Sequence, residues 1–420
     1  MIRPIVLVLA WCHFTTAHDH GHTQQKVFST AELDELERKW GQDWSFSGIS
    51  TFAHLPHVKC LTNPATRYDI AVLGAPFDTA VSYRPGARFG PRAIRASSAR
   101  QTSFRGYNPR ARLNPYTEWA SIIDCGDIPI TPFDNKLALR QMTSAFSELS
   151  TRSTSAINQA QFPYRRMPKL LTLGGDHSIA LPALRALRNL YNQPITVIHF
   201  DAHLDTWHPA KYPSAWLDFA LPDPATISPE DPLWTEQSFF THGNMFWLAH
   251  LEGVIATNSS VHAGLRTRLS GVEDEEEDEA QGWLRIASDE IDELGWKGVA
   301  NRIIDRVTGG KGPGLDDKPV YLSIDIDIID PGSAPATGTP EPGGWTTREL
   351  IRVLRGIDGL NIVGADVVEV SPAYDTVAEQ TATAAAQIGY EVLTSMVRRG
   401  ILEEEWISAR DGTRSAKDEL

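Results

Sequence analysis

Three short segments of the sequence place carboxylates and imidazoles directly after apolar runs. They are Gly174-Gly175-Asp176-His177-Ser178, Asp201-Ala202-His203-Leu204-Asp205 and Asp325-Ile326-Asp327. Side chains alternate along an extended strand, so residues two apart share a face. We therefore expect Asp201, His203 and Asp205 to project together, and Asp325 and Asp327 likewise. In open α/β sheets ligands bind beyond the carboxyl ends of the strands, where all of these side chains should meet.

Four aspartates and two histidines crowded at one sheet edge would need a neutralising partner. Neighbouring carboxylates repel one another and lose hydration, and bound cations remove that cost. Six ligands are too many for one ion but suit two ions that share bridging carboxylates. Oxygen and imidazole ligands without thiolate favour manganese, with zinc, iron, cobalt or nickel as alternatives. The sequence thus predicts a binuclear metal site of His177, Asp201, His203, Asp205, Asp325 and Asp327. Each motif alone is also typical of a helix cap or a hydrogen-bonding residue.

The elements that must position these residues are short apolar runs alternating with helical patterns. The strand candidates are 69–74, 121–125, 170–173, 195–200, 260–264, 320–324 and 362–368. Continuous apolar runs such as 195–198 are typical of strands covered on both faces. Helical patterns between them imply right-handed crossovers and a mostly parallel sheet. The stretch 209–240 has no clean period and is expected to be an insertion.

The three motifs resemble the signatures of the ureohydrolases, the family of arginase, agmatinase and guanidinobutyrase. The resemblance extends from Gly74-Ala75-Pro76-Phe77-Asp78 to Glu369-Val370-Ser371-Pro372. It implies a three-layer α/β/α sandwich around a mostly parallel sheet of about eight strands. It also implies a homo-oligomer, since members of the family form trimers or hexamers.

The resemblance further implies two manganese ions per subunit. One would be held by His177, Asp201, Asp205 and Asp325, and the other by Asp201, His203, Asp325 and Asp327. Asp201 and Asp325 would bridge the two ions. No ligand position departs from the family pattern.

The activity implied by the resemblance is hydrolysis of a guanidinium group to urea and an amine. Glu369 resembles the family glutamate that binds the guanidinium, and His242 resembles the histidine that moves protons. With Asp205, these two are the predicted catalytic residues. A structural ion pair would also explain Glu369, and a capping or core role would also explain His242.

The segment His242-Gly243-Asn244-Met245-Phe246 resembles agmatinases most, and the net charge of −14 suits the dication agmatine. However, 36 residues separate Asp205 from His242, including Trp207, His208, Trp216 and Trp234. This insertion leaves 4-guanidinobutyrate as the near competitor, which would need a cationic partner such as Arg266 or Arg268. Two further classes of protein stay open at this point: a one-zinc deacetylase of related fold and a catalytically inactive metal-binding relative.

Composition narrows the remaining classes of function. The 420 residues are 41% hydrophobic and 22% charged, an ordinary globular balance. Without a basic stripe a nucleic-acid partner is not expected, and without an apolar run of about 18 residues neither is a membrane-spanning helix. The acidic run 273–279 is expected to be a solvated loop or helix start.

The two ends of the chain indicate the secretory pathway. Arg3, the apolar stretch 5–11 and the small residues 15–17 predict a signal peptide over 1–17. The chain ends Lys417-Asp418-Glu419-Leu420, the address read by the KDEL receptor, which predicts residence in the endoplasmic reticulum lumen. Between them we expect an extension at 18–65, a catalytic domain at 66–413 and a tail at 414–420.

Two further features fit such a compartment. Cys60 and Cys125 would remain after signal cleavage, as one disulfide or as two buried thiols. Asn258-Ser259-Ser260 is an N-glycosylation sequon, relevant if the chain enters the endoplasmic reticulum.

Overall fold

The computed structural model describes residues 29–40, 44, 46–155, 167–211, 240–314 and 317–410. The predicted signal peptide, the tail at 414–420, Trp216 and Trp234 lie outside these residues. The chain divides into two compact units, Met1–Trp44 and Ser45–Leu420. Each is described by itself.

In the first unit, helix α1 (Thr30–Trp40) begins at a capping box. Ser29 Oγ accepts a hydrogen bond from Glu32 N (3.3 Å), and Glu32 Oε2 accepts one from Ser29 N (2.9 Å). This reciprocal pair satisfies backbone donors that a helix start leaves unbonded.

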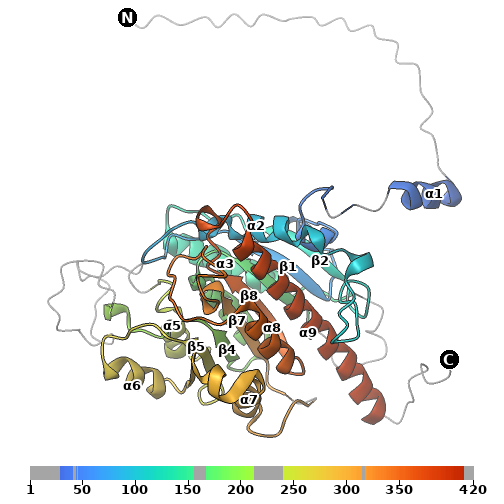
Figure 1. Ribbon diagram of the computed structural model, residues 1–420. Coiled ribbons are helices and arrows are strands. Elements are labelled where there is room, and N and C mark those ends of the chain that lie inside the picture. The colour runs from blue at the N-terminus through green and yellow to red at the C-terminus, as the bar shows by residue number, and fades with distance from the viewer. Residues whose placement is uncertain are drawn as a thin grey trace, which may run out of the picture. The chain divides into compact units, whose positions relative to one another are not determined.

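The second unit contains one eight-stranded sheet in the order β2-β1-β3-β8-β7-β4-β5-β6 (Figure 1). Its strands are β1 (Ile70–Ala75), β2 (Ile122–Asp127), β3 (Lys169–Gly174), β4 (Thr196–Phe200), β5 (Val261–Leu265), β6 (Leu284–Ala287), β7 (Val320–Asp325) and β8 (Ile362–Val368). Every pair of neighbouring strands is parallel. The predicted sheet class is confirmed; the edge strand β6 was not predicted.

Helices cover both faces of the sheet. The helices of this unit are α2 (Gly90–Ser97), α3 (Asn135–Ser150), α4 (Ala180–Tyr191), α5 (Met245–Leu251), α6 (Val272–Ala280), α7 (Glu290–Thr308), α8 (Thr347–Gly356) and α9 (Gln380–Arg410). Helices α2, α7, α8 and α9 share one hydrophobic core with the sheet, and α3, α4 and α5 share another. The predicted three-layer α/β/α sandwich is thus confirmed.

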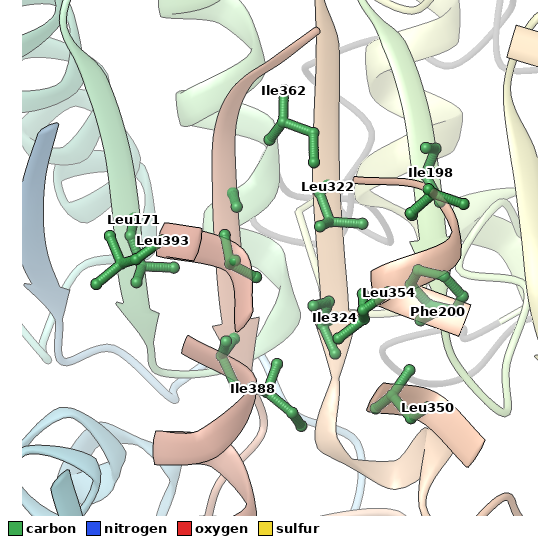
Figure 2. Packing of buried hydrophobic residues seen from close by; sticks show 14 of the residues in the cluster. Leu171, Ile198, Phe200, Leu322, Ile324, Leu350, Leu354, Ile362, Ile388 and Leu393 are labelled. Carbon is green, nitrogen blue, oxygen red and sulfur yellow. The ribbon is translucent and has the colours of Figure 1, made fainter. Parts of the chain in front are cut away.

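Successive side chains of each strand point to opposite faces of the sheet and so contribute to different cores. In β3, Leu171 faces the core of α8 and α9, whereas Leu170 faces that of α3 and α4. Figure 2 shows residues of the first core, among them Leu350 of α8, Ile388 of α9 and Ile324 of β7. No helix among the described residues is long and apolar enough to cross a bilayer.

Part of the segment that we assigned to an N-terminal extension contributes to this second unit. Phe52 is buried in the first core, and its backbone N donates to Asp124 Oδ2 (2.9 Å). A disulfide joins Cys60 to Cys125 of β2, so these cysteines are bonded rather than free thiols.

Candidate active site

The four central strands of the sheet carry the predicted site residues to one edge. They are β3, β8, β7 and β4 in sheet order. His177 follows β3, Glu369 follows β8, Asp327 follows β7 and Asp201 follows β4. Because the strands are parallel, their carboxyl ends meet at the same edge of the sheet, where ligands bind in open α/β folds.

The turn after β3 requires glycine. A Cβ on Gly175 would overlap the backbone carbonyl oxygen of Phe77, which accepts a hydrogen bond from Asp176 N (2.7 Å). This close approach of two loops leads directly into the short 3-10 turn His177–Ile179. His177 is consequently held inside the protein with no exposed surface.

His177 is the centre of the first group of ligand atoms. Its Nδ1 lies 3.1 Å from Asp201 Oδ2 and 3.1 Å from Asp205 Oδ2. Asp325 Oδ2 is 3.3 Å from the same nitrogen. His177 Nδ1 nevertheless makes no hydrogen bond of acceptable geometry with any described residue. Buried atoms that converge in this way without bonding to one another suit a shared cation.

The second group forms around His203. Its Nδ1 lies 3.0 Å from Asp327 Oδ2 and 3.2 Å from Asp201 Oδ1. Asp201 therefore turns one oxygen toward each histidine. Asp325 Oδ1 is engaged by the backbone N of Asp327 (2.8 Å), and its other oxygen faces His177.

The second nitrogen of His177 shows why a cation fits here. Ser323 Oγ donates to Asp366 Oδ1 (2.8 Å), so it accepts from His177 Nε2, 2.7 Å away. In the neutral ring Nδ1 is then a lone pair that faces three carboxylates, as a metal ligand requires. Burial and the charge of Asp201 raise the pKa of Asp327 to about 6, so ionising these acids without a cation is costly. Donor types, burial and electrostatics all fit two divalent ions.

His199, a residue not predicted from the sequence, lies with Asp201 in this cluster. Its Nε2 is 2.9 Å from Asp201 Oδ2, and its Nδ1 is 2.7 Å from His262 Nδ1. Burial lowers the pKa of His199 to about 3, so the ring is neutral. The signal was present: His199 is two residues before Asp201 on a buried strand and shares its face.

Glu369 follows β8 in a left-handed conformation (φ 62°) that non-glycine residues rarely adopt. Its backbone N donates to Gly175 O (2.9 Å), and its Oε1 accepts from His177 N (2.9 Å). The second oxygen, Oε2, is buried and has no hydrogen-bond partner among the described residues. An acceptor left free in this position is ready for a ligand that donates.

His242 lies against Glu369, with His242 Nδ1 3.1 Å from Glu369 Oε1. The backbone N of Ser82 donates to His242 Nε2 (2.9 Å), so the ring proton of the neutral form is on Nδ1. Burial opposes protonation of the ring, but Glu369, Asp205 and Asp176 outweigh it and raise the pKa of His242. Ser82 is a site residue that the sequence analysis missed.

A cavity of about 260 Å³ opens beside these groups. Its walls contain metal-site carboxylates, His242 and a rim of charged residues; they are Ser82, His203, Asp205, Trp207, Lys211, His242, Gly243, Thr267, Arg268, Ser270, Asp274, Asp325, Thr339 and Glu341. The predicted catalytic residues His242 and Asp205 line the cavity, whereas Glu369 is fully buried against His242. The cavity is concave, and members of both groups of ligand atoms line it, which is typical of an active site with a few convergent polar groups.

The structure distinguishes the two arginines that were candidates for binding a substrate carboxylate. Arg266 donates to the backbone oxygens of Glu341 (2.7 Å) and Asp327, so its guanidinium is occupied by the fold. Arg268 is exposed and lines the cavity. On the same rim, Lys211 Nζ is paired with Asp274 Oδ1 at 2.9 Å.

The chain belongs to the arginase family, whose model matches residues 68–394. It is 42% identical to a protein of Schizosaccharomyces pombe named "Putative agmatinase 1", over 96% of each chain. A second protein of that yeast, named "Putative agmatinase 3", is 44% identical over 86% of this chain and 83% of its own. Among solved structures, proclavaminate amidino hydrolase from Streptomyces clavuligerus is similar to this chain, with a TM-score of 0.67 and 33% sequence identity over 85% of this chain and all of that one.

Proposed function

We propose that this protein hydrolyses the guanidino group of agmatine, giving urea and putrescine, with two Mn²⁺ ions per subunit. The observation that carries the proposal is the free, buried Oε2 of Glu369, whose other oxygen contacts the backbone N of the predicted metal ligand His177. The names of the two yeast relatives support the substrate, and oxygen and imidazole ligands without thiolate support the metal. The complete ligand set argues against an inactive metal-binding relative. We also propose that it acts as a homo-oligomer.

The groups of the site have separate roles in the proposed reaction. When bound, two divalent ions lower the pKa of a coordinated water toward neutrality and so supply the nucleophile. Glu369 Oε2 accepts N–H bonds from the guanidinium and fixes its plane, because a charge-assisted planar pair is directional. His242 lies on the cavity wall and holds a proton at Nδ1. Despite burial, the surrounding carboxylates raise the pKa of His242 and favour the imidazolium, which can pass a proton to the leaving amine as the C–N bond breaks and so return to the neutral ring.

One observation favours a second substrate, 4-guanidinobutyrate. Arg268 on the cavity rim makes no ion pair with any described residue, and a carboxylate tail would pair with it. Glu341 on the same rim would instead suit the ammonium of agmatine. His203, and more weakly Arg268, hold the pKa of Glu341 below its usual range, so this carboxylate is ionised.

Urea release from a substrate panel tests the function and separates these two tails. With manganese added, we expect the highest kcat/KM for agmatine, because the substrate is a dication and the protein carries a net negative charge. The panel should contain agmatine, 4-guanidinobutyrate and arginine at matched concentrations. A higher kcat/KM for 4-guanidinobutyrate than for agmatine would identify 4-guanidinobutyrate as the substrate. No urea from any of the three, in protein with both metals bound, would contradict the hydrolase.

We propose the endoplasmic reticulum lumen as the location, from the sequences at 1–17 and 417–420. The Cys60–Cys125 disulfide is typical of an oxidising compartment, and Asn258 of the sequon is exposed. Asn258 precedes β5, at the opposite edge of the sheet from the site, so a glycan there would leave the pocket open.

The sequon provides a direct test of this location. In its native host cell we expect the full chain to carry a glycan that endoglycosidase H removes, and Asn258→Gln to abolish that mobility shift. Deleting 417–420 should send the protein into the medium, because the KDEL receptor would no longer retrieve it. A full-length, unglycosylated chain in the cytosol would contradict the proposal.

A further inference from the structure

Helix α6 (Val272–Ala280) consists largely of acidic residues, yet two of its carboxylates are buried. Asp274 is 2% exposed and Asp278 is not exposed at all, whereas the acidic residues between them are exposed. Residues four apart lie on the same face of a helix, so one face of α6 points into the protein. This corrects the expectation that the whole run is solvated.

Asp278 is held by donors from three directions. Thr206 Oγ1 donates to its Oδ1 (2.6 Å), and His262 Nε2 lies 3.1 Å from the same oxygen. Arg285 donates to its Oδ2 (3.2 Å). Burial opposes ionisation, but His262, Thr206 and Arg285 outweigh it and lower the pKa of Asp278, so the carboxylate is charged.

Two paths lead from Asp278 to predicted metal ligands. In the first, His262 Nδ1 is 2.7 Å from His199 Nδ1, and His199 Nε2 is 2.9 Å from Asp201 Oδ2. The His262 ring is also stacked on Trp283, with centroids 3.9 Å apart. In the second path, Thr206 is bonded directly to Asp278 and is the residue after Asp205.

We propose that Asp278 is a positioning residue for the metal centre, which fixes Asp201 through His262 and His199 and fixes Asp205 through Thr206. The inference rests on the proposed binuclear site. Buried side chains have few alternative rotamers. A series of hydrogen-bonded side chains that begins at a fixed carboxylate therefore holds the metal ligands in one orientation. Groups that orient metal ligands in this way typically contribute about 10- to 100-fold to metal affinity. Asp278 is thereby distinguished from Glu275 and Glu276, which are exposed on the same helix.

The test is Asp278→Ala in the full chain, with Glu276→Ala as the matched control. Both changes remove one carboxylate from α6, but Glu276 is exposed and Asp278 is buried. Alanine leaves no acceptor for Thr206 or His262, whereas an asparagine oxygen would keep both contacts. We expect about a 10- to 100-fold weaker affinity for Mn²⁺ in Asp278→Ala, measured by equilibrium dialysis and elemental analysis. When the proteins are loaded with Co²⁺, we also expect an altered visible spectrum in Asp278→Ala, because the ligand geometry changes. Glu276→Ala should match the parent protein in both measurements.

Metal affinity and the Co²⁺ spectrum are measured without substrate, so they can fail independently of the proposed function. Unchanged affinity and spectrum in folded Asp278→Ala would overturn the positioning role, whatever the urea assay gives. If that variant does not fold, Thr206→Val decides, because it removes only the hydroxyl that links Asp205 to Asp278. A loss of about tenfold in Mn²⁺ affinity there supports the role, and an unchanged affinity overturns it.

Discussion

Glu369→Gln is expected to lower kcat/KM for the guanidino substrate by roughly 10³-fold while the protein remains folded. Glu369 Oε1 accepts hydrogen bonds from His177 N (2.9 Å) and from His242 Nδ1, 3.1 Å away. Both partners donate, so the oxygen of a glutamine amide must occupy this position. The amide nitrogen then replaces Oε2, and its two N–H groups face the N–H groups of the substrate.

The substitution thus keeps the hydrogen bonds that hold the side chain in place, but it puts a donor where the guanidinium needs an acceptor. A hydrogen bond to a charged group contributes about 1.5–3 kcal/mol, and each ~1.36 kcal/mol is a factor of ten in rate. Losing two such bonds therefore gives the predicted size of effect. The measurement is the rate of urea release with manganese in excess, with the exposed Glu405→Gln as a control. A folded Glu369→Gln protein with kcat/KM close to that of the parent would contradict the guanidinium-binding role.

The sheet was predictable because most of its strands are buried on both faces and appear as continuous apolar runs. Strand β8 (Ile362–Val368) matches its predicted range, and β7 differs by one residue. Strand β6 (Leu284–Ala287) was missed because it has four residues, includes Arg285 and is only partly buried at the sheet edge. A short, half-buried edge strand has too few residues for a clear period.

The gathering of site residues at one edge followed from strand periodicity, but their supporting residues did not. Ser323 and Asp366 are polar residues inside the apolar strands β7 and β8, and they are direct neighbours across the sheet. Each could have been noticed as a polar interruption. Their connection to His177, however, depends on β7 and β8 lying between β3 and β4. That order is set by packing between distant segments, which a single sequence does not display.

The burial of single residues within the acidic run was also not predictable from the sequence. Composition alone predicts that 273–279 is solvated, and most of its residues are exposed. Asp278 is buried because His262 and Thr206, which are 16 and 72 residues away in sequence, lie opposite it. Burial of a charge requires such partners, and only the folded chain supplies them.

Asp327→Asn is expected to remove or weaken one of two bound metals and to lower turnover by roughly 10³-fold. Asp327 Oδ1 accepts from the backbone N of Ala202 (3.0 Å), and its Oδ2 faces His203 Nδ1 at 3.0 Å. In the amide, the Ala202 bond holds the oxygen, so the NH₂ group takes the place of the ligating oxygen. An amide NH₂ offers no lone pair to a cation, and the second group of ligand atoms loses a member.

In the metal-free protein the same substitution is expected to stabilise the fold. This opposite effect makes the prediction specific. Burial and the charge of Asp201 both oppose ionisation of Asp327. Removing that charge should therefore raise the melting temperature without metal and reduce the further rise caused by Mn²⁺. Elemental analysis after dialysis should give close to one Mn²⁺ per subunit instead of two, with the exposed Asp305→Asn retaining both. If Asp327→Asn keeps two tightly bound ions and near-normal turnover, Asp327 is not a ligand. The clustered acids would then need a different explanation, because four buried carboxylates are tolerable together only when cations lie among them.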